Sequence, residues 1–165
     1  MRKDEILVQK MHEAGVTVLD RPVRGYKGLL VRRGPDAYVF LSPRMSSRAR
    51  AVILAEEYAH YELSAGDTVR CSDPVRISRS EERALRRAVS HLLCPADVIK
   101  AIRSGAGSLD ELAETLDLPC AFLDLVMRQW RVQHGSEIVI DNEVLNLDPL
   151  EVKPRAPAGI YAELE

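Results

Sequence analysis

The alternation of hydrophobic and polar positions in the first third of the chain predicts one helix and a small sheet. Apolar residues recur at helical spacing over residues 4–14, and Gly15 then provides a helix stop. Gly34 and Pro35 interrupt a later apolar stretch, so we expect the strands on either side of them to form a hairpin. Runs rich in β-branched and aromatic residues predict three strands, at residues 16–19, 28–32 and 37–41.

The pattern then becomes helical. We expect a central helix over residues 51–63 and a second long helix that begins at Ser80 and ends before Pro95. Residues 64–78 contain Gly, Asp, Ser and Pro, and they predict an irregular connection between these two helices. Further helices are predicted at residues 96–102, 108–116 and 119–130.

The last thirty residues carry the weakest pattern. One short strand is predicted at residues 138–140, and the prolines around it favour an extended, partly mobile tail over residues 136–165. We therefore expect one domain over residues 1–135, with residues 108–135 as its helical C-terminal part.

The central helix carries two adjacent carboxylates and a histidine. Glu56 and His60 are four residues apart, so on a helix they lie on the same face, and Glu57 points beside that pair. This is a variant of the His-Glu-x-x-His helix of metalloproteases, with glutamate at the first ligand position. We expect Glu56 and His60 to bind a metal ion and Glu57 to act as general base toward water.

A catalytic zinc ion needs a third protein ligand, which should come from the next helix. Glu82 is the preferred candidate because it lies near the start of that helix, 22 residues after His60. Glu81 is the alternative, and Asp67 is a weaker one. The histidines outside the central helix are interpreted as structural or solvated, namely His12, His91 and His134.

A Glu-Glu-x-x-His sequence also occurs on solvated helix faces, where it binds nothing. Here residues 52–55 and Ala59 are apolar, which places the two carboxylates beside a buried face. Burial of two adjacent negative charges is costly unless a cation compensates them, and this favours the metal site.

Composition excludes several other classes of protein. The formal net charge of −2 argues against a nucleic-acid binder that depends on bulk positive charge. No apolar run approaches the roughly 20 residues that span a bilayer, and we expect no signal peptide because the N-terminal residues are charged. The odd number and wide spacing of Cys71, Cys94 and Cys120 predict reduced thiols, so we expect a cytoplasmic protein.

Several stretches share the pattern of one known family. The first is Leu54-Ala-Glu-Glu-Tyr-Ala-His-Tyr-Glu-Leu-Ser-Ala-Gly-Asp67, and the second, residues 82–95, has an acidic start, the pair Arg86-Arg87 and a closing Leu-Cys-Pro. Upstream and downstream matches are Lys27-Gly28-Leu29, Phe40-Leu41, and residues 109–113 and 133–135. Together, over residues 3–135, they resemble the ImmA/IrrE family of metallo-endopeptidases, in particular its phage and mobile-element branch.

The resemblance implies an α+β fold with a zincin-like metalloprotease core, a small three-stranded antiparallel or mixed sheet, and C-terminal helices. It also implies a function, the metal-dependent cleavage of a helix-turn-helix repressor by an anti-repressor of a prophage or integrative element. Glu56, His60 and Glu82 match the ligand positions, and Glu57 matches the base. An extended substrate segment would add to the sheet edge beside the metal.

The glutamate at position 56 affects the metal and the activity that we expect. Two carboxylates and one neutral imidazole cancel the charge of Zn²⁺, so a bound water would lose its proton at a higher pH than in a two-histidine site. Carboxylate ligands also suit Mn²⁺ or Fe²⁺. The alternative to a protease is a catalytically weak or inactive metal-binding module that binds the repressor without cleaving it.

A third hypothesis is direct DNA binding, because residues 109–126 have the spacing of a helix-turn-helix with its turn at Pro119. The second of these helices, however, starts with Cys-Ala-Phe-Leu-Asp, where basic and amide side chains should read the bases. We therefore favour core packing or a repressor-docking surface for residues 108–130, and we expect no direct contact with nucleic acid.

Overall fold

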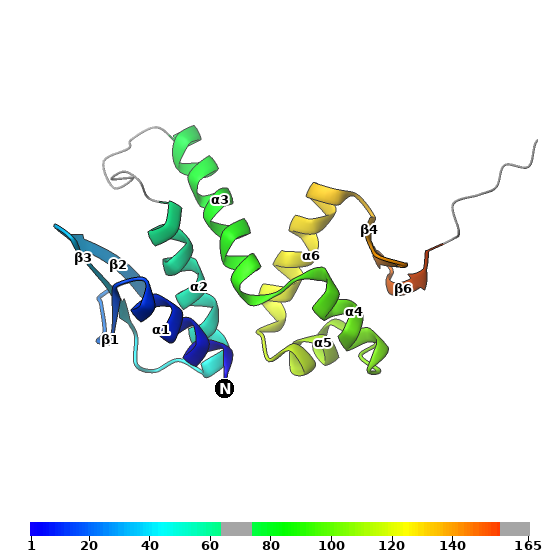
Figure 1. Ribbon diagram of the computed structural model, residues 1–165, viewed down its shortest axis with the longest axis horizontal. Helices are drawn as coiled ribbons and strands as arrows, with labels where there is room; N and C mark the ends of the chain where they lie inside the picture. Colours follow the sequence, from blue (N-terminus) through cyan, green and yellow to red (C-terminus); the bar gives the residue numbers. More distant parts are fainter. Residues whose placement is uncertain (64–73, 156–165) are drawn as a thin grey trace, which may run out of the picture. The chain divides into compact units, whose positions relative to one another are not determined.

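The computed structural model describes residues 1–63 and 74–155 and has the expected α+β class, with six helices and two three-stranded sheets in those residues (Figure 1). The chain divides into two compact units, Met1–Cys94 with Asp117–Pro119, and Pro95–Leu116 with Cys120–Glu165. The division after Cys94 differs from the single domain over residues 1–135 that the sequence suggested. Within the described ranges, none of the helices is both long and apolar enough to cross a membrane.

The sheet of the first unit is mixed, which is one of the two forms expected. Its strands are β1 (Val16–Asp20), β2 (Gly28–Arg33) and β3 (Asp36–Leu41), in the order β1-β3-β2. β2 and β3 form the predicted hairpin, while β1 runs parallel to β3. β2 is therefore an edge strand, and its outer backbone groups are available to elements that pack beside it.

Three helices complete the first unit: α1 (Lys3–Glu13), α2 (Ser47–Leu63) and α3 (Pro74–Leu92). α2 contacts α1, α3 and strand β2, and Figure 1 shows it between the other two helices. The side chains that bury most completely between these elements are aliphatic or sulfur-containing, and they include Leu7, Met11, Val16, Val39, Leu41 and Leu54.

The second long helix is longer than expected. Residues up to Ser78 were predicted to be irregular, but α3 begins at Pro74. Proline is favourable at the first position of a helix, because the N–H that it lacks would have no partner within the helix there. The remainder of the predicted connection, residues 64–73, lies outside the described residues.

The second unit contains the three predicted shorter helices, α4 (Pro95–Arg103), α5 (Leu109–Leu116) and α6 (Cys120–His134). In the first turns of α6, where a DNA-reading helix would expose polar side chains, Phe122 and Leu123 are buried in the unit's core instead. The buried residues of α6 are Phe122, Leu123, Val126, Met127 and Trp130. This burial agrees with core packing, one of the two interpretations given above for residues 108–130.

The extended tail predicted after residue 135 is wrong for residues 137–154. They form an antiparallel sheet of β4 (Glu137–Ile140), β5 (Glu143–Leu147) and β6 (Leu150–Pro154). The first turn places Asp141 at a φ of 52°, which aspartate tolerates better than most residues, and Asp148-Pro149 form the second turn. β5 contacts α6 and buries Leu145 completely, so the sheet belongs to the core of this unit. Residues 156–165 of the predicted tail lie outside the described residues.

We predict that Leu145→Ala lowers the free energy of unfolding of the second unit by about 2–5 kcal/mol, because it leaves a cavity in a packed core. Val139→Ala is the matched control, since Val139 is 51% exposed on β4, and it should cost less than about 1 kcal/mol. Denaturant unfolding followed by the fluorescence of Trp130, the single tryptophan, measures both values. Equal stability of the two variants would mean that the sheet is not part of the core.

Candidate functional site

Helix α2 carries the three residues of the predicted motif at the edge of its buried face. The residues of α2 that are buried completely or almost so are Ala51, Leu54, Ala55 and Ala59. Glu56, Glu57 and His60 are half-buried beside them. The ionisable side chains of the motif are thus partly removed from water, as the apolar pattern of the helix predicted.

Strand β2 approaches α2 very closely at Glu57. The backbone N–H of Leu30 donates a hydrogen bond to Glu57 Oε2 at 2.8 Å. Two residues earlier, a Cβ atom on Gly28 would lie 2.3 Å from Ile53 Cγ2 and 3.2 Å from Glu57 Oε1. Glycine at position 28 therefore permits the strand to come near enough for its backbone to hold the Glu57 carboxylate.

The structure places the two main candidates for a third ligand differently. Glu81 Oε2 lies 3.7 Å from His60 Nε2, whereas Glu82 forms an ion pair with Arg86, four residues further along α3. The sequence favoured Glu82, but Glu81 is the acid that α3 turns toward the motif. Asp67, the weaker candidate, lies outside the described residues.

Negative charge accumulates around the motif. Burial is the main cause that raises the pKa of Glu56 and that of Glu57 above the ordinary glutamate value. The Glu57 carboxylate raises the pKa of Glu56 further, and Glu81 adds to the pKa of both. Opposing effects on the pKa of Glu57 come from His60 and from the Leu30 N–H. The four side chains act on one another electrostatically, as members of one cluster.

The chemical types in this cluster suit a divalent cation, since carboxylate oxygens and imidazole nitrogen bind Zn²⁺, Mn²⁺ and Fe²⁺. The positions of these four side chains must also match those of metal ligands. Among the described residues, no three His, Cys, Asp or Glu side chains converge into a group that could hold a metal ion. For three of these side chains to share one ion, their positions would have to change.

An ion-pair network between α2 and α3 was not anticipated from the sequence. Glu62, in the last turn of α2, accepts hydrogen bonds from Arg87 Nε at 2.7 Å and from another nitrogen of that guanidinium at 2.9 Å. His91 Nε2 lies 2.7 Å from the same carboxylate. The bonds from Arg87 are the largest cause of a lowered pKa at Glu62.

Aromatic contacts extend this network. The ring of His91 lies 4.9 Å from that of Tyr58, whose ring in turn stacks on Tyr61. We call Glu62, Arg87 and His91, with these two tyrosines, the α2–α3 clamp. This position agrees with the interpretation of His91 as a structural or solvated residue. The sequence signal for the clamp was the spacing of four residues between Arg87 and His91, which identifies a partner only when α2 is known to lie alongside.

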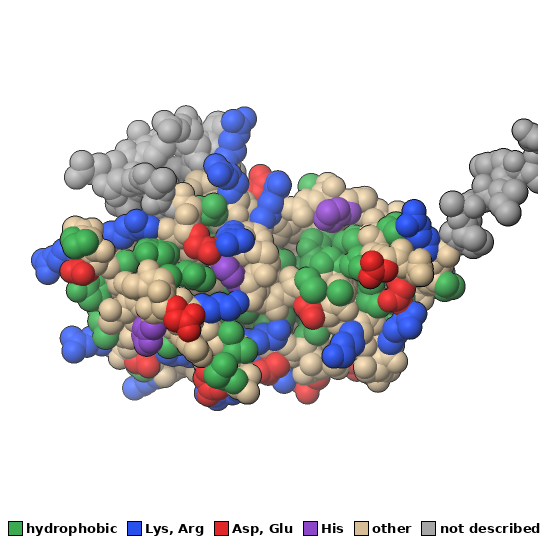
Figure 2. Space-filling view, viewed as in Figure 1, with side chains coloured by type: hydrophobic (Ala, Val, Ile, Leu, Met, Phe, Trp, Pro, Cys, Tyr) green, Lys and Arg blue, Asp and Glu red, His purple; other side chains and the backbone are tan. Residues whose placement is uncertain are grey.

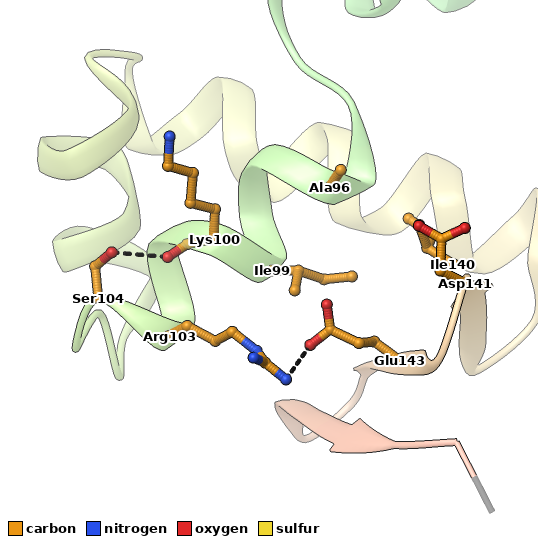
Figure 3. A pocket seen from close by; sticks show the side chains of 8 residues that line it. All are labelled: Ala96, Ile99, Lys100, Arg103, Ser104, Ile140, Asp141 and Glu143. Carbon is orange, nitrogen blue, oxygen red and sulfur yellow. Dashed lines mark hydrogen bonds and ion pairs between the residues drawn. The ribbon is translucent and has the colours of Figure 1, made fainter. Parts of the chain in front are cut away.

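A pocket of about 300 Å³ in the second unit offers less chemistry (Figure 3). It lies between α4 and the turn after β4, and Ile99 and Ile140 form part of its wall. The guanidinium of Arg103 is engaged by Glu143 within it, as the dashed line in Figure 3 shows. This ion pair occupies two of the pocket's charged groups, so the cluster on α2 and α3 remains the better candidate.

Comparisons of the chain with family models, with curated proteins and with solved structures give no match. The resemblance of the motif segments to the ImmA/IrrE family therefore stays a prediction.

We predict that Gly28→Ala lowers the free energy of unfolding by about 1–3 kcal/mol, because the new Cβ overlaps Ile53. In an Ile53→Ala background, which removes Cγ2, the same substitution should cost less than half as much. Gly107→Ala is the matched control, since its Cβ would meet only Glu111 at 3.6 Å. Denaturant unfolding followed by far-ultraviolet circular dichroism provides the four values of the cycle. Strict additivity would contradict the close approach of β2 to α2.

Proposed function

We propose that the chain is a metal-dependent endopeptidase with a zincin-like core, which acts inside the cell on a helix-turn-helix transcriptional repressor. It would serve as an anti-repressor of a prophage or integrative element. The observation that supports this most is the cluster of Glu56, Glu57, His60 and Glu81 where α2 and α3 face each other. Partly buried carboxylates that repel one another are poorly stabilised by the protein alone, and a divalent cation would relieve that repulsion.

The residues have distinct roles in this proposal. Glu56 and His60 would hold the cation, with Glu81 as the third ligand in preference to Glu82, because Glu81 is the acid beside His60. Zinc, or manganese or iron(II) in its place, would supply Lewis acidity toward a water molecule and the substrate carbonyl. Glu57 would accept the proton of the attacking water and later pass it to the leaving amine. Since Leu30 holds Oε2, we assign the proton to Oε1.

The edge of strand β2 supports a mode of substrate binding. Leu30 belongs to this edge strand and already contacts Glu57 through its backbone. An extended repressor segment that added to the edge of β2 would pass beside the cluster with its peptide groups aligned along the strand. The cleaved bond would then lie where β2 and α2 come together.

A second function is favoured by one specific observation. The Leu30–Glu57 hydrogen bond also satisfies an edge N–H, which is a structural role that needs no catalysis. In that case the protein would be a catalytically weak or inactive module that binds the repressor and leaves it intact. A helix-turn-helix DNA-binding function is less favoured, because α6 begins with Cys-Ala-Phe-Leu and buries Phe122 and Leu123.

We predict that the wild-type protein cleaves a co-expressed helix-turn-helix repressor and that Glu57→Gln lowers the cleavage rate at least about 100-fold, because the general base is lost. Glu137→Gln, on the exposed edge of β4, is the matched control and should cleave normally. Immunoblotting of the repressor over time measures the rates. If Glu57→Gln cleaves at the wild-type rate, the assigned base is wrong. If the wild type binds the repressor without cutting it, the binding-module function is correct.

A further inference from the structure

Charge is distributed very unevenly along the chain. Residues 1–94 contain 17 Lys and Arg against 12 Asp and Glu, a net charge of +5, whereas residues 95–165 contain 6 against 13, a net charge of −7. The overall value of −2 conceals this separation. A basic part of a chain can attract a polyanion even when the whole chain is acidic.

Helix α3 gathers part of this positive charge on one face. Arg79, Arg83, Arg86 and Arg87 are all exposed, and they form what we call the arginine face. At about 100° per residue, these four positions lie within an arc of about 100° on the helix. They extend over about 12 Å of the helix axis, at a rise of about 1.5 Å per residue. Figure 2 shows cationic side chains along α3.

The acids of α3 do not cancel this face, although they alternate with the arginines in the sequence. Glu81 points to the other side of the helix, where it meets His60. Glu82 offsets only Arg86, and Arg87 is engaged by Glu62 of α2. Among the described residues no acid pairs with Arg79 or Arg83, which lie one helical turn apart, so these two carry most of the positive charge that the face presents to solvent.

The side-chain composition of the arginine face indicates the type of partner that it binds. Protein interfaces have an apolar centre, usually with aromatic side chains. Among the described residues, every exposed large hydrophobic side chain comes from an element or segment other than α3. A row of guanidinium groups suits a repetitive anion, and duplex nucleic acid presents one phosphate per about 1.7 Å of its axis.

We infer that the arginine face of α3 binds the phosphate backbone of nucleic acid without reading its sequence. Arg79 and Arg83 make the main contacts, and Arg86 and Arg87 extend the row. The inference is independent of the metal site, because none of these four side chains belongs to the proposed ligand set. It concerns backbone contacts by α3 and gives α6 no part in base recognition.

The test is fluorescence anisotropy of a labelled DNA duplex of arbitrary sequence, titrated with the full-length protein at several salt concentrations. We expect binding at low salt that weakens linearly on a log–log plot of affinity against salt concentration. In Arg79→Gln/Arg83→Gln the slope of that plot should fall by about two, one for each lost phosphate contact. Arg24→Gln/Arg33→Gln is the matched control, because it removes the same charge from exposed positions outside α3. Circular dichroism checks that both variants are folded.

Three results would overturn the inference. The first is no salt-dependent binding by the wild type at low salt. The second is an equal loss of slope in the two double variants, which would assign binding to bulk charge. The third is competition by polyglutamate as effective, per charge, as competition by unlabelled duplex, which would assign the arginine face to an acidic polypeptide.

Discussion

The close approach of strand β2 to helix α2 is the constraint on which the candidate site depends. Gly28 has no side chain, so the strand can lie against Ile53 and bring the Leu30 N–H to Glu57. The same approach sets an edge strand beside the acidic motif, which is the geometry that an extended substrate would need. One glycine thus links the packing of the sheet to the position of the proposed base.

Negative charge is compensated at one end of the α2–α3 contact and accumulates at the other. At the clamp, Glu62 is matched by Arg87 and His91, and its pKa is lowered. At the motif, Glu56 and Glu57 have raised pKa values, and Glu81 adds more negative charge. An ion-paired carboxylate stabilises a helix pair, whereas an unbalanced cluster is typical of a functional site. The clamp would hold α2 and α3 together against the repulsion that the motif creates.

Much of the fold was predictable because periodicity reports directly on local structure. The β2–β3 hairpin, the half-burial of the motif and the succession of helices all followed from it. The predictions that were wrong have physical causes. The β4–β6 sheet depends on packing against α4 and α6, which the pattern within residues 136–154 does not show. The start of α3 depends on Pro74, and proline is common both in loops and at the first position of a helix. The sequence preferred Glu82 to the adjacent Glu81 as the candidate third ligand, but only the packing of α3 against α2 decides which of the two faces His60.

Calorimetric titration of the metal-free protein with Zn²⁺ measures whether Glu56, His60 and Glu81 bind a divalent cation. Glu81→Gln and Glu82→Gln form a matched pair of adjacent, isosteric changes. We expect one Zn²⁺ per chain, an affinity lowered at least about tenfold by Glu81→Gln, and an affinity unchanged by Glu82→Gln. Absence of binding by the wild type, or a loss caused by Glu82→Gln alone, would contradict this expectation.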